Sequence, residues 1–136
     1  MAIGLKTTLR NARLNLIRDA IDADIDSGYI ELLSGIRVAT GSEFVGNAVL
    51  AVGTFSKPCA PDAINGVLTF DSITGDNALD DGQVVWARVY DGSGQFVMDM
   101  SVGQTGSGAD IEMNVVDVVQ GGPVVFNIAS ISSGNA

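Results

Sequence analysis

Apolar and polar residues alternate most regularly over residues 83–103, where two runs of period two flank a short turn. The first run places Trp86 and Tyr90 on one face and smaller apolar residues on the other. The turn at residues 91–94 contains the dipeptides Asp-Gly and Ser-Gly, which are typical of a β-hairpin. Because both faces of the first run are at least half apolar, we expect this hairpin to lie at the centre of a β-sandwich, with Trp86 and Val89 buried.

A second pattern, with apolar residues three and four positions apart, predicts a helix over residues 5–26. Thr7 or Thr8 is the expected N-terminal cap, and Gly28 lies where a helix-terminating glycine is common. The predicted apolar stripe consists of Leu9, Leu14, Leu16, Ile17, Ile21 and Ile25.

The rest of the chain reads as short strands separated by turns rich in glycine, proline and acidic residues. Besides the two arms of the hairpin, strands are expected at residues 29–33, 48–55, 67–73, 111–119 and 124–131. Seven short strands predict a mainly β fold, a β-sandwich or jelly-roll-like domain with one N-terminal α-helix. We therefore expect a helical arm over residues 1–28 and a β-sandwich domain over residues 29–136.

The apolar content is high for a single small domain, because 46% of the 136 residues are hydrophobic and the mean hydropathy is +0.32. No apolar run approaches the roughly 20 residues of a membrane helix, and the N-terminus lacks the continuous apolar run of a signal peptide. We therefore expect no membrane association. An apolar surplus of this kind indicates contacts between chains. A homo-oligomer is expected, with a trimer favoured.

The charge is divided unevenly along the chain. Residues 1–18 hold four basic residues and no acidic one, whereas residues 19–136 hold 16 acidic and three basic residues, a net charge of −13. An overall charge of −9 disfavours nucleic acid as a partner. The basic segment either pairs with the acidic body of its own domain, is solvated, or faces a neighbouring subunit.

The sequence contains few groups suited to catalysis. It has no histidine, and its one cysteine, Cys59, lies between prolines with no base to activate it. The glycine pairs at residues 92–94 and 106–108 do not open a helix, so they read as turns and not as phosphate loops. We expect no catalytic residue and no cofactor.

Two clusters of carboxylate side chains are candidates for cation sites. Asp22, Asp24 and Asp26 are spaced like the start of an EF-hand loop, but Ser27 and Leu33 replace the glycine and glutamate that such a loop needs. The second cluster is an acidic surface loop for which solvation is the favoured reading and cation binding stays open. It consists of Asp71, Asp76, Asn77, Asp80 and Asp81. No metal is expected.

The order of several motifs resembles a group of small structural proteins of tailed-bacteriophage virions. The resemblance spans nearly the whole chain, and it departs at Val38-Ala39, where those proteins have a proline after the arginine of the first turn. The matching stretches are Arg10-Asn11-Ala12-Arg13-Leu14 with Ile17, Ser34-Gly35-Ile36-Arg37, and residues 65–70, 86–94, 102–114 and 121–124.

The resemblance implies a structural part of a phage particle without catalytic residues. The expected function is a capsid decoration (cement) protein that binds the major capsid protein or other virion subunits. The expected location is the virion, assembled in the host bacterial cytoplasm. Alternatives are a neck, tail or tail-tip structural protein, a carbohydrate-binding β-sandwich module with exposed aromatic residues, and an unrecognised enzyme. The expected attachment surface lies on the N-terminal helix, at Lys6, Arg10, Arg13, Leu14, Ile17, Arg18 and Ile21.

Overall fold

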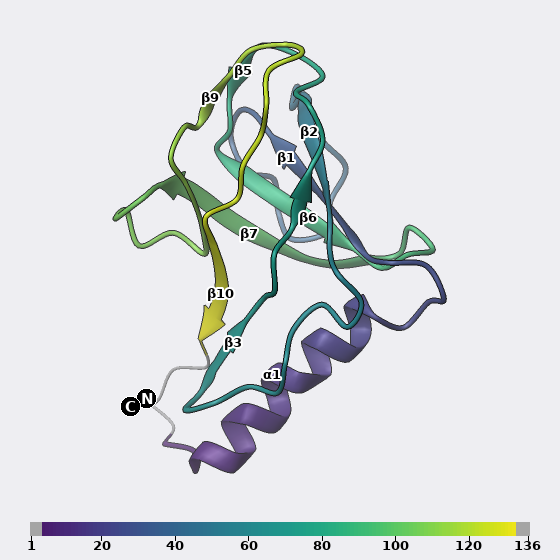
Figure 1. Cartoon of the computed structure of the whole chain (residues 1–136), viewed down its shortest axis with the longest axis vertical. Helices are drawn as coiled ribbons and strands as arrows, with labels where there is room; N and C mark the ends of the chain where they lie inside the picture. Colours follow the sequence, from purple (N-terminus) through teal and green to yellow (C-terminus); the bar gives the residue numbers. More distant parts are fainter. Residues whose placement is uncertain (1–3, 133–136) are drawn as a thin grey trace.

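The computed structural model describes residues 4–132, which form one helix and ten short strands (Figure 1). This mainly β architecture confirms the predicted fold class. The elements are α1 (Thr7–Ile21), β1 (Tyr29–Leu33), β2 (Val49–Thr54), β3 (Val67–Thr69), β4 (Thr74–Gly75), β5 (Gly82–Gln83), β6 (Trp86–Tyr90), β7 (Phe96–Gln104), β8 (Ile111–Met113), β9 (Asp117–Val118) and β10 (Ile128–Ser132).

Eight strands form a curled sheet in the order β3-β10-β8-β7-β6-β1-β2-β4, and β5 pairs with β9 in a separate ribbon. The paired strands are antiparallel except for β7 and β8, which are parallel. Helix α1 lies beside β3 at one end of the long axis of the molecule, and the β5–β9 ribbon lies at the opposite end (Figure 1).

The predicted hairpin is present as β6 and β7, at the centre of the curled sheet. The Asp91 carboxylate closes its turn by accepting hydrogen bonds from the backbone N–H and hydroxyl of Ser93 and from the N–H of Gln95. These donors stabilise the ionised carboxylate and lower the pKa of Asp91 below its usual value. Trp86 and Val89 are buried, as expected.

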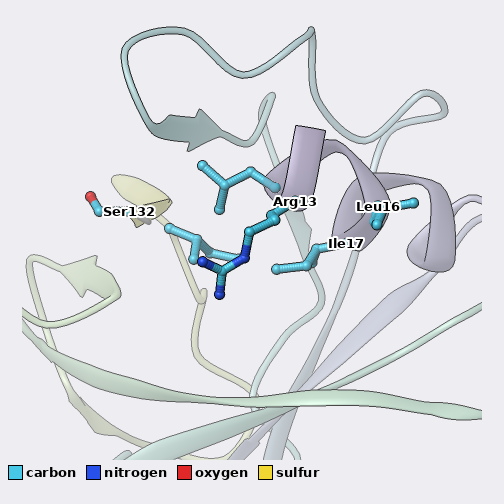
Figure 2. Close-up of a pocket in the computed structure, with 6 residues that line it drawn as sticks. Arg13, Leu16, Ile17 and Ser132 are labelled. Atoms are coloured by element: carbon cyan, nitrogen blue, oxygen red, sulfur yellow. The ribbon is translucent and has the colours of Figure 1, made fainter. Parts of the chain in front are cut away.

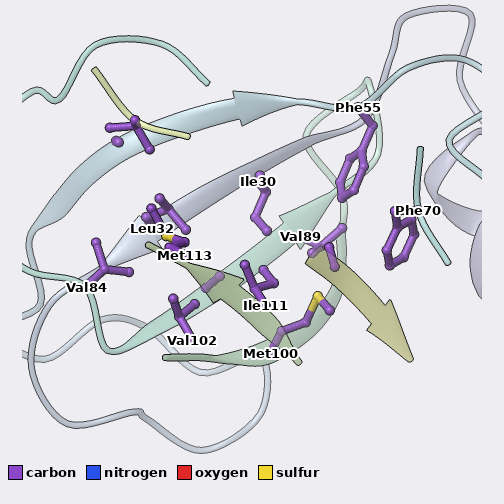
Figure 3. Packing of buried hydrophobic residues seen from close by; sticks show 14 of the residues in the cluster. Ile30, Leu32, Phe55, Phe70, Val84, Val89, Met100, Val102, Ile111 and Met113 are labelled. Carbon is purple, nitrogen blue, oxygen red and sulfur yellow. The ribbon is translucent and has the colours of Figure 1, made fainter. Parts of the chain in front are cut away.

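The inner face of the curled sheet carries the hydrophobic core (Figure 3). Side chains from the central strands meet there, and Phe55 and Phe70 close one side with their ring centroids 5.2 Å apart. Each aliphatic side chain buried in this way contributes about 1.5–3 kcal/mol to folding. The central members are Ile30, Leu32, Val89, Met100, Val102, Ile111 and Met113.

The outer face of the central hairpin is covered by the connection between β1 and β2. Arg88 and Asp99 form a buried ion pair with an Nε–Oδ1 distance of 2.8 Å. Arg88 also donates to the Ser42 carbonyl, and Asp99 accepts from the Gly41 N–H. The Phe44 ring lies 4.8 Å from the Arg88 guanidinium, so a cation–π contact adds to these bonds. This network holds residues 34–48 against the sheet, and removing one partner of such a buried pair typically costs about 3–5 kcal/mol.

Several predicted strands are shorter than the hydrophobic pattern suggested. The expected strand over residues 67–73 ends at Thr69, and the one over residues 124–131 is extended into a strand only from Ile128 onward. The segment 111–119 divides into β8 and β9, which belong to different sheets. Only isolated backbone hydrogen bonds, such as the one from the Phe70 N–H to the Ala129 carbonyl, form over the remaining residues of these segments, so the ladders do not continue there.

The helix is also shorter than predicted, and its ends differ from the expected caps. Lys6 is the N-terminal cap residue and makes no side-chain cap bond, so the assignment to Thr7 or Thr8 was wrong. Gly28 does not end the helix either. It is a close-approach position, because an added Cβ would lie 2.5 Å from Cγ2 of Ile21 and 2.9 Å from the Tyr90 carbonyl.

Candidate functional site

The inner face of α1 is part of the same buried cluster as the strands. Leu14 and Ile21 are 2% and 0% exposed, and Ile17 is partly buried against the cluster. These three residues were predicted as part of an attachment surface. Leu14 and Ile21 are occupied within their own chain, so a partner can reach them only if the helix leaves the domain. Whether residues 29–136 fold without the helix stays a prediction.

Two asparagine side chains fix the helix to the chain segment before β3. Asn15 Oδ1 accepts a hydrogen bond from the Ala63 N–H, and Asn11 Oδ1 accepts one from the Gly66 N–H, both at 2.8 Å. Each bond satisfies a part-buried backbone donor, and leaving such a donor unpaired costs about 1–3 kcal/mol. Hydrogen bonds from polar side chains therefore help to position the helix, in addition to the packing of its apolar face.

Two of the basic residues that were predicted to form the attachment surface make contacts within their own chain. Arg18 pairs with Asp62 at 2.5 Å and with Asp19 at 3.1 Å, and these acceptors raise the pKa of Arg18. Arg10 donates to the hydroxyl of Thr7.

Lys6 and Arg13 are exposed, and neither forms an ion pair within residues 4–132. Figure 2 shows Arg13 and Ile17 extending from the helix beside the end of β10. They line a hollow of about 350 Å³ there together with Leu16 and Ser132. The basic end of the helix is therefore accessible, although its deepest apolar residues are not.

The outer face of α1 contains an exposed apolar stripe, whose leucines were predicted to be part of a single wide stripe along the helix. Leu9 and Leu16 are 44% and 68% exposed. They alternate with basic residues at a spacing of three and four, which places all of them on one helix face. The signal was present in the sequence, but it was merged with the buried stripe. This outer stripe consists of Lys6, Leu9, Arg13, Leu16 and Ala20.

A second exposed apolar surface lies at the opposite end of the molecule and was not singled out from the sequence. It is a groove of about 450 Å³ along β9 and the returning segment 122–125. Val115, Val119 and Val125 are 60%, 68% and 61% exposed, and Asp117 lies among them. Asp117 forms no ion pair within the described part of the chain.

The walls of this groove are held by backbone hydrogen bonds. The Ala78 N–H donates to the Gly122 carbonyl and the Gly121 N–H donates to the Ala78 carbonyl, both at 2.8 Å. The Asp81 carboxylate accepts from the Gln120 N–H at 2.7 Å. The acidic loop weighed above as a cation site is thus used in part to attach the groove to the rest of the fold.

The described residues contain no group of three or more Cys, Asp or Glu side chains placed to hold a metal ion. Asp22, for example, accepts from the Cys59 N–H, whereas Asp24 accepts from the N–H of Asp26. The Cys59 thiol is buried, and desolvation, reinforced by the nearby Asp22 carboxylate, raises its pKa to about 12. A thiol of this kind is protonated and unreactive at neutral pH.

The aromatic residues do not form an exposed platform for a sugar. Phe96 is the one exposed aromatic side chain within residues 4–132, and its ring lies 5.2 Å from the Arg88 guanidinium. Tyr29 and Tyr90 stack on each other with centroids 4.9 Å apart and are half-buried. In the same residues, no helix combines the length and apolar character needed to cross a membrane.

Comparison of the chain with protein-family models, with curated proteins and with solved structures gave no significant match.

Proposed function

We propose that this protein is a structural component of a bacteriophage virion, a capsid decoration (cement) protein that stabilises the head shell. The observation that carries the proposal is the amount of apolar side chain left on the surface of a small, well-packed domain. Twelve large hydrophobic residues within residues 4–132 are exposed. Three of them, Val115, Val119 and Val125, lie together in one groove, and a contiguous apolar surface of this kind is typical of a subunit that buries it against a neighbour.

The order of motifs that resembles small tailed-phage virion proteins supports the same proposal. In this function the β domain bridges adjacent shell subunits and adds buried area across their seams. An interface of about 800 Å² per partner is sufficient for a stable contact. Exposed basic residues on α1 would orient the protein against an acidic partner and increase its association rate.

The proposal is tested by quantitative mass spectrometry of purified phage particles assembled with the chain present. A decoration protein is expected in hundreds of copies per particle. A count of about six or twelve, the size of one cyclic ring, would instead place the chain in the neck, tail or tail tip. Absence from washed particles would overturn a virion function, and a specific hit on a glycan array would favour the carbohydrate-binding alternative.

A variant of the helix sharpens this test. Ile17 packs against the core, so a charge at that position changes both the fold and the attachment surface. Leu16→Asp changes only the exposed stripe. We expect Leu16→Asp to lower the copy number in particles severalfold, while Ile36→Asp, at a 90% exposed position away from the helix, leaves it unchanged.

A further inference from the structure

The two exposed apolar surfaces differ in charge. The outer stripe of helix α1 contains Arg13, and Lys6, the N-cap residue, extends it at one end. The groove at the other end contains Asp117, and the neighbouring loop holds Asp76, Asp80 and Asp81. Residues 58–87 and 89–136 contain no lysine or arginine, so the groove and its neighbouring loop have no basic residue of their own to neutralise their acidic ones.

The two surfaces cannot meet within one chain. Helix α1 and the β5–β9 ribbon lie at opposite ends of the long axis (Figure 1). The helix is tied to its own end by Leu14, Ile21 and the two asparagine bonds. A contact between stripe and groove therefore requires two molecules.

We propose that the groove of one copy binds the outer stripe of α1 of a second copy, so that the chain assembles head to tail. Leu9 and Leu16 would pack against Val115, Val119 and Val125, and Arg13 would face Asp117. The groove combines exposed valines with an aspartate, and the stripe combines exposed leucines with basic residues, so the two surfaces are both apolar and opposite in charge, as expected of a specific contact.

Charge also selects this arrangement over the symmetric ones. A helix-to-helix dimer through the middle of the stripe would bring the Arg13 side chains of two copies together, and a groove-to-groove dimer would bring their Asp117 side chains together. Both arrangements place like charges opposite each other, which opposes association. A head-to-tail contact leaves one stripe and one groove free at its ends, so it extends into a closed ring or an open filament. The inference concerns the isolated chain, and it is independent of whether the protein acts in a virion.

The proposal is tested by mixing two variants that each lose one surface. Leu16→Asp keeps the groove and loses the stripe, whereas Val119→Asp keeps the stripe and loses the groove. Both residues are 68% exposed, so the fold tolerates the charge, and far-UV circular dichroism verifies this. Leu9→Asp and Val125→Asp replace them if either variant fails to fold.

Sedimentation velocity is measured for each sample up to several hundred micromolar. The wild-type chain and the control Ile36→Asp are expected to sediment as concentration-dependent species heavier than the 14.0 kDa monomer. Each surface variant alone is expected to be monomeric. An equimolar mixture is expected to form a species of twice the monomer mass and nothing larger, because only one productive pair of surfaces remains.

A monomeric wild-type chain at the highest concentration would overturn the proposal. It would also be overturned if either surface variant alone kept the wild-type mass, because that result indicates a symmetric contact. A mixture that stays monomeric would overturn it as well.

Discussion

The helical end of the molecule and the end formed by the β5–β9 ribbon are held in place by different kinds of contact. Side chains attach the helix, chiefly Ile21 in the core and Asn15 on the Ala63 N–H. Backbone contacts hold the other end, where an added Cβ on Gly75 would lie 2.2 Å from the Val124 carbonyl oxygen.

Both ends nevertheless leave apolar side chains in solvent, and these exposed side chains do not help to hold either end in place. Exposed Leu16 and Val119 therefore carry little of the folding free energy, in contrast to buried Ile21 and Val118 nearby. Positions of this kind can be altered with small effects on the fold and large effects on association. The comparison separates residues that build the molecule from residues that are free to bind.

The largest effect on stability is expected for Ile21→Ala, which removes a fully buried side chain from the junction of helix and sheet. We expect a loss of about 2–5 kcal/mol in the free energy of unfolding, because the cavity left behind cannot close fully. Urea denaturation measures it. Leu16→Ala, on the opposite face of the same helix, is the control and should change stability by less than about 0.5 kcal/mol.

The adjacent valines of the groove offer the same comparison at the other end. Val118 is 8% exposed and belongs to the core cluster, whereas Val119 is 68% exposed. Val118→Ala should cost about 2 kcal/mol, from two buried carbon groups at about 0.8 kcal/mol each plus a small cavity. Val119→Ala should be nearly neutral for the monomer in the same denaturation experiment, and equal costs for the two would show that the groove is closed in solution.

A smaller effect is expected for Asn15→Ala, which leaves the part-buried Ala63 N–H without its acceptor. We expect a cost of about 1 kcal/mol, which is roughly a fivefold change in the population of the opened helix. The Cys59 thiol reports this opening, because its sulfur lies 3.8 Å from the Arg18 carbonyl oxygen in the helix. Thiol labelling should therefore be about fivefold faster in Asn15→Ala than in the wild type.

The pKa of the Cys59 thiol determines the pH at which the labelling experiment is done. Burial raises the pKa of Cys59 from 9.0 to about 12, so the folded state favours the protonated form. Its contribution to stability is present below pH 9 and is lost as the pH rises toward about 12. Labelling at about pH 8 keeps this contribution constant, and a rate equal in both proteins would show that Asn15 does not hold the helix.

The smallest effect is expected from charge. Arg13→Glu or Asp117→Lys alone should weaken association only a few-fold, since an exposed ion pair contributes about 0–1 kcal/mol. Mixing the two variants should restore much of the loss, because both contacts that can form between unlike copies again place opposite charges face to face. Sedimentation at low and high salt measures the effect, which should shrink at high salt. If association is independent of salt in every sample, the charged residues do not contribute to the contact.

The sequence was sufficient to predict the hairpin and the existence of the helix, because local turn chemistry and periodicity determine both. It was not sufficient to assign the faces of the helix. Two apolar stripes run along α1, one through Leu14 and Ile21 and one through Leu9 and Leu16. Both have helical spacing, so only the packing of the sheet shows which stripe is buried.

The register of the hairpin and the presence of the groove could not be predicted from the sequence for a similar reason. A hairpin closed directly over residues 91–94 would pair Arg88 with Val97. The turn instead spans residues 91–95, so that Tyr90 pairs with Phe96, and a shift in register between Val89 and Tyr90 then pairs Arg88 with Asp99 and creates the buried ion pair. The groove depends on β5 and β9, strands of two residues each, which produce no pattern of their own.

The most direct test of the contact between the stripe of one copy and the groove of another is chemical cross-linking between copies. One chain carries Leu16→Cys, the other carries Val119→Cys with a tag that changes its mass, and a short bismaleimide joins thiols that come close. Native Cys59 is buried and protonated, so it does not compete. We predict that the mixed dimer of Leu16→Cys with Val119→Cys forms much faster than either homodimer. A predominance of either homodimer, or no cross-link at concentrations where the wild type is oligomeric, would contradict the head-to-tail contact.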